Sequence, residues 1–202
     1  MRRVIAFAFV VSFLGSSLVH AAPLTVDSGR SFVQFTSKAP FETVIGKTSD
    51  VSGEIHLSRE NLRSVSGTIR VQAASLKTGN RLRDKNMRED YLETDKFPSI
   101  VFQIERVVSG PTAVATGREG SYTLEGAIEI HGVRKKLTVP ATVSIEQDGG
   151  IKVESDFVTG LSDFQIKRPS FLIMRLAEEV TVKVKLALGR GSHKSQVTSL
   201  HF

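Results

Sequence analysis

The chain has 202 residues, no cysteine and a formal net charge of +6. A chain of this length can bury a core without disulfides, and the lack of cysteine excludes thiol catalysis, thiolate metal sites and anchoring through an acylated cysteine. The positive charge is a mild excess without a polybasic tract. It is compatible with transient contact with an anionic membrane surface, and it falls short of a nucleic-acid-binding footprint. We therefore expect no nucleic acid partner.

The N-terminus has the three parts of an export signal. Met1-Arg2-Arg3 is basic, residues 4–14 form an apolar run, and Val19-His20-Ala21 ends in a small residue. The apolar run is too short to span a bilayer, and the longer twin-arginine consensus is missing. We therefore predict a cleaved Sec-type signal peptide over residues 1–21 and a periplasmic location for the rest of the chain.

Alternating apolar and polar residues, the pattern of a half-buried strand, fill most of the remaining sequence. Strands are predicted over residues 32–38, 51–57, 65–71, 100–104, 122–130, 137–145, 151–157 and 180–188. Turn residues at His131-Gly132 and Asp148-Gly149-Gly150 favour short antiparallel connections. About eight one-faced strands favour closure into a barrel, because closure removes exposed sheet edges.

Residues 78–95 interrupt the alternation. This segment is polar and charged, and its few apolar residues have a helix-like spacing. Thr78 or Asn80 is the predicted N-cap, and Pro98 marks the end of the segment. We therefore predict an all-β domain over residues 22–188, an antiparallel eight-stranded barrel with a short helical insertion around residues 78–95. The polar, aperiodic residues 189–202 are predicted to be a flexible tail.

The interior of an eight-stranded barrel is either filled by its own side chains or wide enough for one slender ligand. Gly53, Gly67 and Gly126 fall on the apolar faces of their strands. Two explanations stay open: the glycines relieve strain where strands bend, or they leave an internal channel. A channel walled by aliphatic and phenyl groups would hold an alkyl or isoprenoid chain without covalent attachment.

The candidate lining residues are those that alternation places on the inner face of each strand. They are Val33, Phe35, Val65, Gly67, Ile69, Val71, Ile100, Phe102, Leu124, Gly126, Ile128, Leu137, Val139, Val153, Phe157, Val182 and Val184.

Four polar residues are candidates for a position at the barrel mouth. For Arg81, Arg83 and Asp84 two interpretations stay open. An Arg and an Asp at i, i+3 can pair on a helix surface, or these residues clamp the loop over the barrel mouth beside a ligand head group, since Arg offers a bidentate fork. His131 is predicted to be a turn residue, and contact with the ligand is the alternative. No metalloprotease helix, nucleophile elbow or Walker loop occurs after residue 21, so we expect no metal, no covalent cofactor and no enzyme activity.

Two sequence blocks resemble the YceI-like family, and the resemblance extends over residues 24–188. The first block consists of Thr78-Gly79-Asn80, Arg83-Asp84, Met87, Tyr91-Leu92 and Lys96-Phe97-Pro98-Ser99-Ile100-Val101-Phe102. The second consists of Leu124-Glu125-Gly126, Ile130-His131-Gly132-Val133 and Leu137-Thr138-Val139. The chain departs from the family pattern at Leu92, at Arg134 and around residues 161–166, where the usual arginine and glycine are missing.

The resemblance implies a lipocalin-like barrel in the periplasm that binds polyisoprenoid lipids such as quinones or polyprenols. The leading hypothesis is therefore a binding or carrier protein for a long apolar isoprenoid lipid. A second hypothesis is a ligand-free structural or stress-related barrel that acts through protein partners. A third, weaker one is a hydrolase or isomerase that uses residues 81–84. The sequence leaves the oligomeric state open, a homodimer included.

Overall fold

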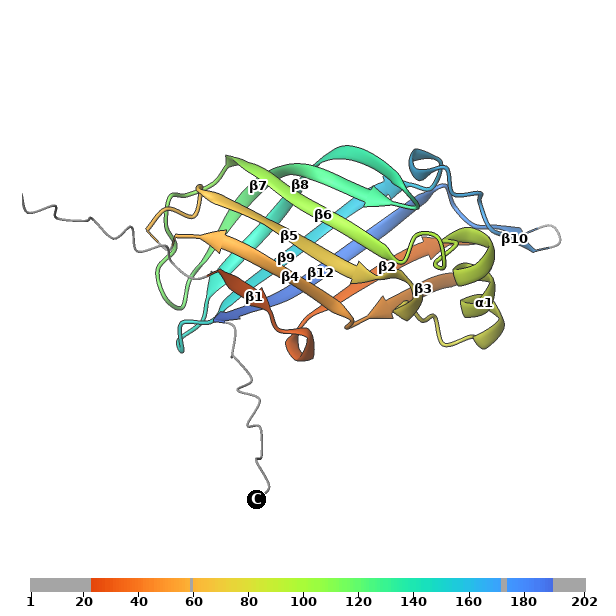
Figure 1. Cartoon of the computed structure of the whole chain (residues 1–202), viewed down its shortest axis with the longest axis horizontal. Helices are drawn as coiled ribbons and strands as arrows, with labels where there is room; N and C mark the ends of the chain where they lie inside the picture. Colours follow the sequence, from red (N-terminus) through yellow and green to blue (C-terminus); the bar gives the residue numbers. More distant parts are fainter. Residues whose placement is uncertain (1–22, 59, 172–173, 191–202) are drawn as a thin grey trace, which may run out of the picture.

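The computed structural model describes residues 23–58, 60–171 and 174–190, and most of them form one antiparallel sheet (Figure 1). The strands of this sheet are β1 (Leu24–Val26), β2 (Phe32–Lys38), β3 (Thr43–Thr48), β4 (Val51–Leu57), β5 (Val65–Gln72), β6 (Ser99–Ser109), β7 (Glu119–Ile130), β8 (Val133–Ile145), β9 (Ile151–Gly160) and β12 (Glu179–Arg190). A separate small hairpin consists of β10 (Ser170–Phe171) and β11 (Met174–Arg175).

The sheet closes on itself because β12 pairs with β9 on one side and with both β1 and β2 on the other. The 3-10 turn η1 (Ser28–Arg30) separates β1 from β2, so these two strands are one interrupted strand along the edge of β12. In the same way, β3 pairs with β2 and β4 pairs with β1. Counted as continuous units, the strands form a closed eight-stranded antiparallel barrel, which confirms the predicted fold.

The hairpin between β7 and β8 shows how local sequence sets the register. Ile130 pairs with Val133, and the two residues between them, His131 and Gly132, have φ angles of 52° and 72°. Positive φ at both central residues is the property of the type I′ turn, whose twist matches that of the flanking strands. The predicted turn at His131-Gly132 is therefore confirmed.

The predicted helical insertion is also confirmed, as α1 (Arg81–Asn86) followed by the π-helical turn η3 (Met87–Tyr91). Asn80 is the N-cap, since its side-chain oxygen accepts hydrogen bonds from the backbone N–H groups of Leu82 and Arg83, at 3.1 Å each. The insertion lies at the end of the barrel opposite to the ends of β1 and β12 that lead to the termini (Figure 1). Among the described residues, no helix has the length and apolar composition needed to cross a bilayer.

Two strands of the barrel, β1 and β3, were not predicted, and neither were the two-residue strands β10 and β11. β1 has only three residues. β3 buries Val44, Gly46 and Thr48 and exposes Ile45, so apolar residues fall on both of its faces and no alternation of apolar and polar residues marks the strand. β12 continues to Arg190, past the predicted domain boundary at residue 188. The predicted signal peptide and residues 191–202 of the predicted tail lie outside the described residues.

The inward glycines are sites of close approach. A Cβ atom on Gly126 would lie 2.3 Å from the backbone oxygen of Gln103 and 2.9 Å from the ring of Phe102. A Cβ atom on Gly67 would lie 2.4 Å from the backbone oxygen of Glu54. Neighbouring atoms thus occupy the space next to these glycines, which supports close packing between strands as the reason for their presence and argues against a direct widening of the channel.

We predict that Gly126→Ala lowers the free energy of unfolding by about 1–3 kcal/mol, because the new methyl group overlaps backbone that cannot move independently. Gly189→Ala is the matched control, since nothing lies within 4 Å of the added atom. Its effect should stay within about 0.5 kcal/mol. Urea unfolding followed by circular dichroism measures both, and equal stabilities would contradict the close-approach interpretation.

Candidate functional site: an apolar tunnel inside the barrel

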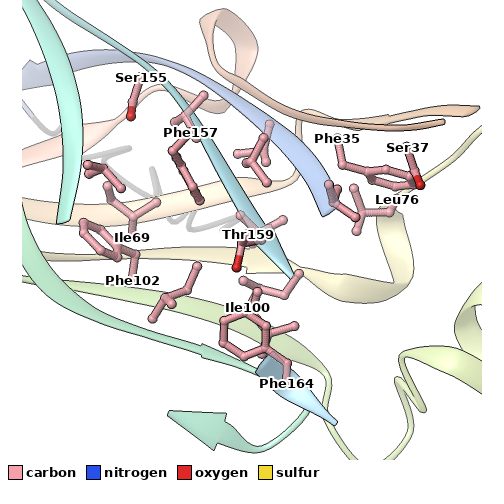
Figure 2. Close-up of a pocket in the computed structure, with 18 of the residues that line it drawn as sticks. Phe35, Ser37, Ile69, Leu76, Ile100, Phe102, Ser155, Phe157, Thr159 and Phe164 are labelled. Atoms are coloured by element: carbon pink, nitrogen blue, oxygen red, sulfur yellow. The ribbon is translucent and has the colours of Figure 1, made fainter. Parts of the chain in front are cut away.

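The barrel encloses a cavity of about 600 Å³, within the usual range of small-molecule sites. Its wall comes from the inner faces of β2 to β9 and β12, together with α1, η3 and the 3-10 turn η4 (Ser162–Phe164). Figure 2 shows Ile100 and Phe102 of β6 and Phe157 of β9 projecting into this space. The enclosed surface is overwhelmingly hydrocarbon, and it extends along the barrel as a tunnel.

Most of the predicted lining residues do line this tunnel. They are Val33, Phe35, Val65, Ile69, Val71, Ile100, Phe102, Leu124, Ile128, Val139, Val153, Phe157, Val182 and Val184.

Three predicted lining residues do not line the tunnel. Gly126 is covered by the ring of Phe102, and Gly67 lies under Ile55. Leu137 packs against a buried cluster near the helical end of the barrel. Alternation assigned all three to the inner face, but it could not show which neighbouring side chains cover them.

The predicted lining residues do not include those that close the helical end of the tunnel, although the apolar residues 161–174 were one candidate cover for the mouth, with ordinary packing as the alternative. Leu76, Leu161, Phe164, Ile166 and Leu176 line it from loops and short turns. Phe164 and Ile166 are nearly fully buried, in a cluster with Ile128. The apolar content of residues 161–174 was the available signal, but loops have no periodicity that would indicate a face.

At the opposite end the tunnel is closed by a second cluster. Leu62, Tyr122 and Ala141 are buried there against one another. The backbone N–H of Leu62 donates a 2.7 Å hydrogen bond to the carbonyl oxygen of Thr112, which joins the β4–β5 and β6–β7 connections beneath the cluster. The tunnel thus has one end sealed by strand residues and one end formed by the insertion and loops.

Arg83 lies at the helical rim and lines the tunnel, as proposed for a mouth residue. Its Nη1 donates to Glu42 Oε1 at 2.8 Å, and its Nε donates to Thr78 Oγ1 at 2.9 Å. Arg83 and Glu42 are the only charged residues in the described tunnel wall, and they are paired with each other. The rim therefore carries a neutralised ion pair that ties the β2–β3 hairpin to α1.

The other polar candidates do not line the tunnel. Arg81 is exposed, and no ion pair between described residues joins it to Asp84, which corrects the predicted i, i+3 pair. Asp84 is instead buried and accepts hydrogen bonds from the backbone N–H and the hydroxyl of Thr78, at 2.8 and 2.6 Å. Asp84 thus positions the loop that leads into α1.

His131 connects three elements at the same end of the barrel. Its Nε2 lies 2.8 Å from Glu93 Oε2, and its Nδ1 lies 3.2 Å from the carbonyl oxygen of Phe164. The ring also makes an edge-to-face contact with Phe97. The position of His131 outside the tunnel wall agrees with the turn role, and its side chain ties the β7–β8 turn to η4 and to the end of η3.

Two hydroxyl groups are exceptions to the apolar wall. Ser37 and Tyr122 both line the tunnel, and their oxygens are the only buried side-chain polar atoms in the described part of the chain without a hydrogen-bond partner. Burial raises the pKa of the Tyr122 phenol, so this group stays a neutral donor. No group of three or more His, Asp or Glu side chains within the described ranges is arranged to bind a metal ion.

We predict that Tyr122→Phe keeps the fold and leaves the free energy of unfolding unchanged or higher by up to about 1 kcal/mol, because an unpaired buried hydroxyl is removed. Thr78→Val provides the contrast, since it removes a hydroxyl that Asp84 and Arg83 both use. It should cost about 1–3 kcal/mol. Denaturant titration of both variants checks this, and a large loss in Tyr122→Phe would show that the phenol has a partner.

The contribution of Glu93 to stability depends on pH. Lys96 in the first place, and His131 in the second, hold the pKa of the Glu93 carboxyl below its ordinary value. A lowered pKa in the folded state stabilises the protein above the unfolded-state pKa, and this stabilisation is lost as pH falls through the folded-state pKa. Glu93→Gln should therefore be less stable than the wild type at neutral pH and equally stable in acid.

Urea midpoints of the wild type and Glu93→Gln across the acidic range measure this difference. Asp90→Asn is the matched control, because Asp90 is exposed and forms none of the ion pairs found between described residues. A pH-independent gap for Glu93→Gln, or the same gap for Asp90→Asn, would contradict the assigned role.

Comparison with known proteins agrees with this architecture. A family model described as a YceI-like domain matches residues 24–188. A UPF0312 protein from Pseudomonas syringae pv. tomato is 26% identical over 185 residues, which cover 87% of this chain and 93% of that protein. The similarity therefore extends over the barrel as a whole.

Solved structures share the fold at lower identity. A polyisoprenoid binding domain from Saccharophagus degradans has a TM-score of 0.70 at 16% identity, over 85% of this chain and 100% of that one. Burkholderia cenocepacia BcnA has a TM-score of 0.68 at 21% identity, over 80% and 98%. With the family model covering the whole barrel, the chain belongs to the YceI-like family.

Proposed function

We propose that this protein binds a long apolar isoprenoid lipid, of the quinone or polyprenol type, inside the barrel. The observation that carries the proposal is the tunnel of about 600 Å³ with its almost entirely hydrocarbon wall. Such a wall recognises an extended hydrocarbon chain by burial alone. The family membership and the similarity to a domain described as polyisoprenoid binding support the same class of ligand.

The charges of the wall limit which part of a lipid enters. Glu42 and Arg83 are paired at the rim, and the rest of the described wall has no charged residue. Placing an ionised group deep in such a tunnel would cost several kcal/mol without compensation. The hydrocarbon chain therefore occupies the interior, and a charged head group would stay at the helical rim.

A carrier role is supported by the similar free energies of burying the lipid chain in the tunnel and in a membrane. Each buried CH₂ group gains about 0.8 kcal/mol on leaving water, so a long isoprenoid chain is never free in solution. A bilayer offers nearly the same gain, which leaves a small net preference between the two sites. A small preference permits both loading and release, as a carrier requires. The signal peptide predicted over residues 1–21 supports the periplasm as the site of this proposed role.

The tunnel can be filled by substitution to test the proposal. Val184 lies on the tunnel wall, and its neighbour Lys183 points to the opposite face of β12. We expect Val184→Trp to retain the fold and to lose at least about tenfold in bound lipid, because the indole occupies the ligand's volume. Lys183→Trp, the matched control, should bind as the wild type does.

The measurement is organic extraction and mass spectrometry of protein purified from a bacterial host, followed by loading with a fluorescent polyprenol in detergent. Circular dichroism confirms that both variants are folded. A wild type that neither yields lipid on extraction nor takes up the probe would refute the proposal. Equal uptake by Val184→Trp would place the lipid outside the barrel.

A further inference from the structure

We propose that the helical end of the barrel is a membrane-docking face that binds bilayers containing anionic lipids. Large apolar side chains are unusually exposed there. Phe41, in the β2–β3 connection, is 84% exposed, and Leu82, in the first turn of α1, is 68% exposed. Ile45, on the outer side of β3, is 48% exposed. Scattered apolar residues are ordinary on protein surfaces, but a group of them around the mouth of a lipid-sized tunnel marks an interaction site.

The geometry links these side chains to one another and to the tunnel. The ion pair between Glu42 and Arg83, at 2.8 Å, places the residue after Phe41 against the residue after Leu82. Leu82 itself is both exposed and part of the tunnel wall. The exposed apolar surface is therefore continuous with the inner surface of the barrel. A hydrocarbon chain could pass between bilayer and tunnel along this surface without crossing water.

The charges on the same segments favour an anionic membrane. Lys38, Lys77 and Arg81 are exposed and have no carboxylate partner among the ion pairs between described residues. Within residues 38–48 and 77–86 the only acidic residues are Glu42, which pairs with Arg83, and Asp84, which is buried against Thr78. In the following turn η3, Glu89 pairs with Lys85, and Asp90 is exposed. Basic side chains around an apolar patch are the arrangement that interfacial membrane-binding surfaces use.

The occupant of this face is a lipid bilayer, and continuity with the tunnel is the reason. A protein partner would cover the apolar patch equally well, but it would block the entry of a ligand into the tunnel. A bilayer covers the patch and supplies the ligand of the proposed function. The inference rests on that function only for the transfer step; docking itself requires no ligand.

The far end of the barrel offers matched controls. Val108, near the end of β6, is 41% exposed, and Arg118, just before β7, is also exposed. Phe41→Ser is therefore paired with Val108→Ser, and Arg81→Glu with Arg118→Glu. Phe41 and Arg81 do not line the tunnel, so their replacement leaves the wall of the binding site intact.

Co-sedimentation of the whole protein with vesicles of phosphatidylcholine and phosphatidylglycerol measures docking. We expect the wild type to bind and added salt to weaken binding, because screening reduces the attraction between the basic residues and the lipids. Phe41→Ser and Arg81→Glu should each bind several-fold more weakly, roughly tenfold for Phe41→Ser. Both control variants should bind as the wild type does. A wild type that does not bind vesicles would overturn the proposal.

A second readout separates this proposal from the proposed function. A fluorescent polyprenol is offered either in detergent or in vesicles. Phe41→Ser should load normally from detergent and slowly from vesicles. Normal loading from both sources would overturn the docking face and leave the lipid-binding function in place. Failure of the wild type to load from either source would overturn the function, whereas vesicle co-sedimentation would still test the docking face.

Discussion

The structure depends on the pairing of β12 with strands on both sides. Backbone N–H and C=O groups at a sheet edge must find partners, and here Val184 and Leu188 meet β2 and β1 along the same edge of β12. Closure gives every strand an inner and an outer face, so alternation in sequence becomes a division between a hydrocarbon interior and a polar exterior. Eight strands set an interior about wide enough for one slender chain.

Two aromatic rings of the tunnel wall lie over glycines of the neighbouring strand. The ring of Phe102 covers Gly126, and the ring of Phe35 covers Gly46, where a Cβ atom would overlap it. Each ring lies against the wall over a glycine of a neighbouring strand, and the axis of the barrel remains open. The glycines therefore act indirectly, because they hold rings against the sheet.

Ion pairs and side-chain hydrogen bonds hold the helical end of the barrel together, where the insertion and loops, and not the sheet, cover the tunnel. The Glu42–Arg83 pair fixes the hairpin to α1, and His131 joins Glu93 to the backbone of Phe164. These contacts hold the insertion and η4 over the tunnel mouth through charged and hydrogen-bonded groups outside the hydrocarbon wall. This end can therefore present both a polar framework and exposed apolar side chains, whereas the opposite end is sealed by packing around Tyr122.

From the sequence alone, the alternating pattern predicted most strands, the barrel and the inner face, because every second side chain of a half-buried strand points to the same face. Asn80 and His131-Gly132 likewise predicted a helix start and a turn, since capping and positive φ are local. Tertiary structure alone decided what alternation cannot encode: that Leu137 is covered, that Asp84 binds Thr78 and leaves Arg81 unpaired with it, and that Phe164 closes the mouth. Leu137 and Phe164 contact residues far apart in the chain, which only the closed barrel brings together. Asp84 and Thr78 are six residues apart, but their contact forms in an aperiodic loop that has no pattern to predict it.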